Sequence, residues 1–190
     1  MRIRGLLIAC CTCAIFLSPL SLEAAPSHDT RTVCEWLLLH DLAEQQLAAS
    51  LTVAVDTVRY ALFGGMYREE HSDSLMVDGL AAGFEEGSRA VESGLVALSG
   101  LADSFSSPPA LSTVDRLLRT LRDAESAFND AVAVIEALPG EGEERAEAAW
   151  RSEEVRAALD ELGHSIEALM TLEIPPSVVE SARRLMEELE

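Results

Sequence analysis

The chain has 190 residues, of which 48% are hydrophobic and 5% aromatic, and its formal net charge is −19. Roughly 165 residues remain once an amino-terminal leader is set aside, which is the size of one ordinary domain with an apolar core. So acidic a surface repels the phosphates of nucleic acids and of anionic lipids, which excludes a nucleic-acid partner, whereas cations and basic proteins are attracted.

The amino terminus has the three parts of a secretory signal peptide. Two arginines lie within the first four residues, residues 5–22 are almost wholly apolar, and small residues follow. We expect cleavage after Ala24, which gives a signal peptide over 1–24 and a single periplasmic or secreted domain over 25–190 with no membrane span. The alternative is a leader retained as an anchor, although the apolar run is near the short limit of about 20 residues for a span.

Cys34 is the single cysteine of the predicted mature domain, because Cys10, Cys11 and Cys13 belong to the leader. One thiol cannot form an internal disulfide, so packing alone must hold the domain together. We expect a half-buried free thiol at Cys34. The alternative is an intermolecular disulfide that links two copies of the chain into a homodimer.

Apolar periodicity and helix-stop residues predict five helices and no strand. Thr32 and Glu35 form a capping box at the start of the first helix, and Gly64 and Gly65 end it. The pattern is clearest in the third helix, where apolar residues follow i, i+3, i+4 spacing. The predicted helices cover residues 33–63, 73–105, 113–138, 143–172 and 178–189. Four long helices with short connections predict an all-α fold, an antiparallel four-helix bundle with the short fifth helix folded over one end.

The second predicted helix carries glycine on its apolar face. Gly79, Gly83 and Gly87 recur every four residues, and Gly94 follows on the same face. Each interior glycine costs about 1 kcal/mol relative to alanine, so something must offset that cost. One interpretation is close approach of a neighbouring helix backbone. The other is a groove for a ligand or a partner helix.

Five ionisable residues suggest a metal site. His40 and Glu44 fall within the apolar arc of the first helix and Glu125 within that of the third, while Glu161 and His164 have the Glu-x-x-His spacing of di-iron carboxylate bundles. In an up-and-down bundle these residues lie at similar heights. However, only one Glu-x-x-His is present, and His164 falls outside the apolar arc of its helix. The alternative is a structural hydrogen bond between His40 and Glu44.

Motifs of nucleophilic, phosphate-binding and zinc-protease chemistry are missing. The sequence has no Gly-x-Ser-x-Gly, no glycine-rich phosphate loop with lysine and no His-Glu-x-x-His. We therefore expect a non-enzymatic binding or adaptor module without a cofactor, for an unidentified protein or small ligand. The alternative function is a metal- or cofactor-binding bundle.

Overall fold

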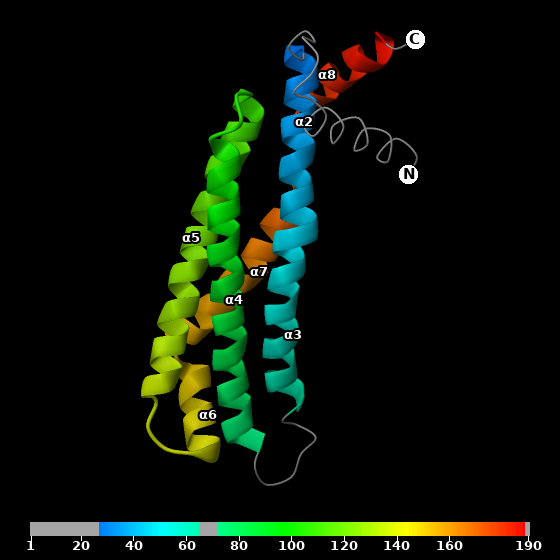
Figure 1. Ribbon diagram of the computed structural model, residues 1–190. Coiled ribbons are helices and arrows are strands. Elements are labelled where there is room, and N and C mark those ends of the chain that lie inside the picture. Colours follow the sequence, from blue (N-terminus) through cyan, green and yellow to red (C-terminus); the bar gives the residue numbers. More distant parts are fainter. Residues whose placement is uncertain (1–26, 65–71, 189–190) are drawn as a thin grey trace, which may run out of the picture.

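The computed structural model describes residues 27–64 and 72–188. Every regular element in these two ranges is helical, which confirms the predicted all-α class (Figure 1). The predicted signal peptide and its cleavage point lie outside the described residues. None of the described helices combines the length and the hydropathy needed to cross a membrane.

The first long rod consists of three consecutive helical segments. They are α2 (His28–Asp41), the π-helical η1 (Leu42–Leu47) and α3 (Ala48–Gly64). α2 starts five residues earlier than predicted because the Ser27 side chain caps it, accepting a hydrogen bond of 3.2 Å from the Thr30 amide. The capping box predicted at Thr32 and Glu35 is therefore wrong, since both residues lie inside the helix.

Two further long helices run alongside this rod. They are α4 (Ser72–Ala102), which packs against α3, and α5 (Pro108–Ala137), which packs against α4. α5 also begins five residues earlier than predicted. Pro108 and Pro109 lie between the second and third predicted helices, but they form the first turn of α5, where the missing amide N–H groups need no partner.

The fourth predicted helix is in fact two helices. α6 (Gly142–Arg151) packs against α4, and α7 (Glu153–Met170) packs mainly against α5. The break is at Ser152, whose ψ of 133° is extended and whose side chain accepts a hydrogen bond of 3.3 Å from the Val155 amide. Serine followed by two glutamates is a favourable helix start, since the glutamates lie at the positive end of the helix dipole. The break lets α7 run obliquely behind the other helices in Figure 1.

The last helix, α8 (Pro176–Glu187), returns to the beginning of the described chain. It packs against α2 and projects beyond the long helices at that end of the molecule (Figure 1). A single apolar core extends through the long helices, and the Phe84 and Phe128 rings stack in it with their centroids 5.9 Å apart. α8 adds only Val178 to the buried apolar residues and so lies at the margin of the core.

Candidate ligand-binding cleft

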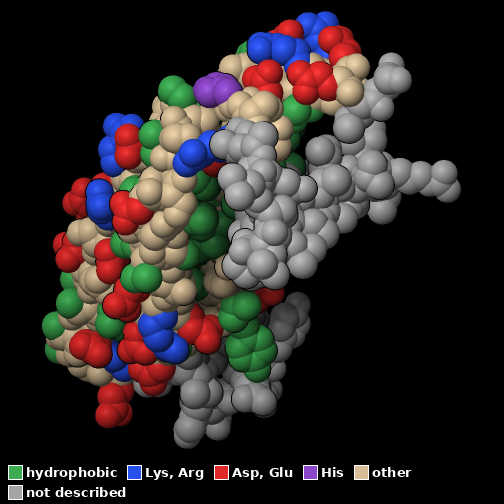
Figure 2. Space-filling view, turned by 45° about the horizontal axis from the view of Figure 1, so that its top comes forward, with side chains coloured by type: hydrophobic (Ala, Val, Ile, Leu, Met, Phe, Trp, Pro, Cys, Tyr) green, Lys and Arg blue, Asp and Glu red, His purple; other side chains and the backbone are tan. Residues whose placement is uncertain are grey.

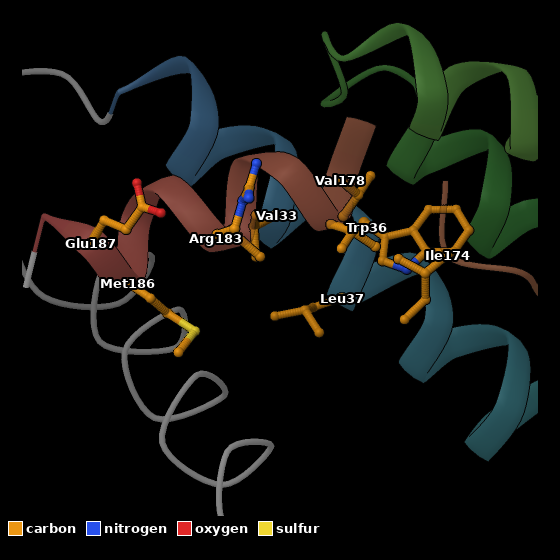
Figure 3. Close-up of a pocket in the computed structure, with 10 residues that line it drawn as sticks. Val33, Trp36, Leu37, Ile174, Val178, Arg183, Met186 and Glu187 are labelled. Atoms are coloured by element: carbon orange, nitrogen blue, oxygen red, sulfur yellow. The ribbon is translucent and has the colours of Figure 1, made fainter. Parts of the chain in front are cut away.

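An apolar cleft lies between α2 and α8 (Figure 3). Its volume is about 440 Å³. α2 contributes three residues, the segment before α8 contributes Ile174, and α8 contributes the remainder. The lining side chains are Val33, Trp36, Leu37, Ile174, Val178, Val179, Ala182, Arg183, Met186 and Glu187.

Helical periodicity explains why these residues face one another. Val33, Trp36 and Leu37 have i, i+3, i+4 spacing and so form one stripe on α2. On α8, Val178, Ala182 and Met186 follow one another at intervals of one turn, and all three line the cleft. Val178 is buried, whereas Met186 is 54% exposed.

The floor of the cleft contains an unpaired hydrogen-bond donor. Trp36 is only 2% exposed, and its indole Nε1 is buried without a hydrogen-bond partner in the part of the chain that the structure describes. A buried donor without a partner costs about 1–3 kcal/mol. Figure 3 shows the Trp36 ring between Val178 and Ile174. The Nε1 atom is not exposed to the cleft, so a bound acceptor would reach it only if the neighbouring side chains moved apart.

The outer part of the cleft exposes apolar side chains to solvent. Ile174, Val179 and Met186 are 53%, 55% and 54% exposed. Isolated exposed apolar residues are ordinary, but a group of them around one cavity marks a binding surface. The charged residues at the rim are Arg183, which forms an ion pair with Glu180, and Glu187. Over the face seen in Figure 2, acidic side chains and arginines are interspersed.

A buried carboxylate holds the neighbouring part of α2 in place. Glu35 accepts hydrogen bonds from the backbone N–H groups of Ser106 and Ser107, at 2.9 and 2.8 Å, and from Arg31 Nε at 2.9 Å. Its charge thus lies at the amino terminus of α5, where the helix dipole favours an anion. Burial raises the pKa of Glu35, but hydrogen bonds from Ser107, Arg31 and Ser106 outweigh it and lower the pKa from 4.5 to about 2.

The predicted glycine face is in close contact with α3 and α5. A Cβ atom at Gly83 would lie 2.6 Å from Val58 Cγ2 and 3.1 Å from the Val58 backbone nitrogen. The corresponding distance is 2.7 Å at Gly79, to Ala61 Cβ. A Cβ atom at Gly87 would lie 3.0 Å from Phe128 Cε2 of α5, and one at Gly94 would lie 2.5 Å from Leu47 Cδ2 of η1. These distances favour close helix packing and leave no space for a ligand at the four glycines.

The five residues of the predicted metal site do not come together. Within residues 27–64 and 72–188, no three His, Cys, Asp or Glu side chains are arranged to hold a metal ion. His40 Nδ1 lies 3.1 Å from a Glu44 carboxylate oxygen, which is the structural alternative, but Glu44 is 47% exposed and does not point into the core. The prediction placed Glu44 inward by assuming a regular α-helix. The π-helical η1 begins at Leu42 and changes the angular position of the residues that follow.

The other three residues of that set lie elsewhere. Glu125 is half-buried on α5, and His164 is exposed on α7. Glu161 lines a second, polar cleft of about 480 Å³ between α5 and α7. The other carboxylates that line it are Asp123, Asp130, Glu153 and Glu154.

Cys34 is half-buried on α2, as expected. The predictions of a free thiol and of a disulfide-linked dimer stay predictions, because the other three cysteines lie outside the described residues.

Comparisons with models of known protein families, with curated proteins and with solved structures find no match for this chain. The function is therefore argued from the geometry of the chain itself.

Proposed function

We propose that this protein is an exported binding module whose ligand occupies the cleft between α2 and α8. The ligand would be a small, largely apolar molecule with an oxygen acceptor. The observation that carries this proposal is the apolar cleft itself, around which the apolar side chains of Ile174, Val179 and Met186 are more than half exposed. The cavity volume of about 440 Å³ falls in the range of roughly 300–1,000 Å³ that small-molecule sites occupy.

The chemistry of the cleft supports this class of ligand. Apolar walls stabilise a bound hydrocarbon by about 25 cal/mol for each Å² removed from water. Arg183 at the rim, which also forms an ion pair with Glu180, offers a cation to an anionic end group of the ligand. A medium-chain carboxylate such as dodecanoate has both features and is a suitable probe.

We also propose how the rest of the chain serves this site. The rod from α2 to α3, the helices α4 and α5, and the pair α6–α7 would act as the four members of an antiparallel bundle, with α8 as an added helix. The leader would direct export and then be removed, so that the acidic surface keeps the domain soluble. Metal binding is the weaker candidate, since no described cluster of ligands supports it.

The proposal can be tested with two matched methionine substitutions. Met186→Glu adds a carboxylate in the cleft, whereas Met170→Glu adds one on α7, at a methionine that is 65% exposed and does not line the cleft. Dodecanoate binding is measured by isothermal titration calorimetry. We expect Met186→Glu to weaken binding at least tenfold and Met170→Glu to leave it unchanged. Equal binding by both variants, or no binding by the wild-type protein, would contradict the proposed site.

A further inference from the structure

We propose that α8 is a hinged lid over the α2 side of the cleft, held closed by Asp29. The kind of molecule that the lid would admit rests on the proposed ligand site. The opening of the lid does not rest on it.

The attachment of α8 to the rest of the molecule is narrow. Among the described elements, α2 is the only one with which it makes an extended contact. It follows a connection of five residues, 171–175, that contains no helix and ends in proline. Val178 is its one fully buried apolar side chain. Because so little apolar surface holds it, α8 can leave α2 at a much smaller cost than global unfolding.

Polar contacts supply much of what holds α8 in place. A carboxylate oxygen of Asp29 accepts a hydrogen bond of 2.7 Å from Ser181 Oγ, and the other lies 3.1 Å from an Arg184 guanidinium nitrogen. Ser181 and Arg184 are three residues apart and so share one face of α8. Ser181 is buried and the Asp29 side chain is 20% exposed, so solvent has little access to their hydrogen bond, whereas the Arg184 side chain is 54% exposed and its ion pair is screened more.

The position of this contact determines what opening would expose. Asp29 is in the first turn of α2, one turn before Val33, and the same helix face continues to Trp36. α8 contributes the opposite wall of the cleft through Val178, Met186 and others (Figure 3). Departure of α8 would therefore uncover Trp36, which is buried while the lid is closed.

Hydrogen–deuterium exchange with mass spectrometry tests the lid in the purified protein without any ligand. The test variant is Asp29→Ala, and the matched control is Asp160→Ala, an exposed helical aspartate on α7. A second test variant, Ser181→Ala with Arg184→Ala, breaks the same contact without altering the first turn of α2. In the wild-type protein we expect amides of α8 to exchange faster than those of α4 and α5. Both test variants should accelerate α8 exchange about tenfold while α4 and α5 stay unchanged.

Each outcome decides the proposal. Exchange of α8 at the same rate as α5 in the wild-type protein would overturn the lid, because it would show that α8 opens only with the whole domain. Acceleration by Asp160→Ala as large as by Asp29→Ala would also overturn it. If α8 opens as expected but dodecanoate does not bind, the lid stands and the proposed ligand class fails.

Discussion

Glu35 provides the most direct test of how this fold is held together. Its carboxylate joins α2 to the turn before α5, and no other described side chain receives hydrogen bonds from both Ser106 and Ser107 amides. Replacement of Glu35 by glutamine keeps the size of the side chain but removes its charge. The buried N–H groups would then face one neutral oxygen and one NH₂ group, which donates instead of accepting.

The size of the effect follows from the pKa. A decrease of the Glu35 pKa from 4.5 to about 2 corresponds to about 3 kcal/mol of stability, since one pKa unit is worth 1.36 kcal/mol. The pKa is lower in the folded state, so this stability is fully present above about pH 4.5. It decreases as the pH falls and is lost near pH 2; at pH 3 less than half remains, about 1.4 kcal/mol.

Urea unfolding from pH 7 to pH 3 measures this contribution in the wild-type protein and in Glu35→Gln. The matched control is Glu92→Gln, which removes the charge of an exposed glutamate on α4. We expect Glu35→Gln to lower the free energy of unfolding by about 3 kcal/mol at pH 7, and the difference from wild type to become smaller toward pH 3. Groups other than Glu35 titrate in both the wild-type protein and Glu35→Gln, so they cancel in this difference. A difference that is constant with pH, or that is equal for Glu92→Gln, would refute the reasoning.

Three further substitutions test the packing and the capping of the helices. Gly83→Ala should lower the free energy of unfolding by about 1–3 kcal/mol, because the new methyl group meets the Val58 backbone and the helices must separate. Gly100→Ala on the same helix should raise it by about 0.5–1 kcal/mol, since nothing lies within 4 Å of its Cβ position; equal effects in thermal melts would argue against close packing at Gly83. Ser152→Ala should cost about 1 kcal/mol through loss of its hydrogen bond with the Val155 amide, and unchanged chemical denaturation would show that the cap of α7 contributes nothing.

The apolar faces of the helices were predictable because periodicity is a local property. Four apolar residues of the third predicted helix, Val114, Leu121, Phe128 and Ile135, are buried in α5. The helix boundaries were less predictable. Thr32 and Glu35 match a capping box, but Glu35 binds the α5 terminus, which is 71 residues away in the sequence. The local pattern could not show that Glu35 accepts hydrogen bonds from the Ser106 and Ser107 amides, because only the tertiary structure brings these groups near.

The candidate cleft escaped prediction for a related reason. The sequence predicts an apolar arc on the first helix and a short fifth helix folded over one end of the bundle. Neither pattern predicts that the apolar faces of α2 and α8 leave a cleft between them. The unpaired Trp36 N–H could not be predicted from the sequence either, because the atoms that surround an indole in the folded structure decide whether it has a hydrogen-bond partner. The amphipathic spacing of α8 was the one signal available.

By itself, the sequence determined that this chain is helical, strongly acidic and built on apolar stripes, because composition and the 3.6-residue period depend on neighbouring residues alone. Only the tertiary structure decided which residues end the helices, where the π-helical turn rotates Glu44 out of the core, and that α8 lies against α2 with a cleft between them. These features depend on contacts between residues far apart in the chain. The free energies of such contacts exceed the small local preferences of about 1 kcal/mol per residue on which a sequence pattern rests.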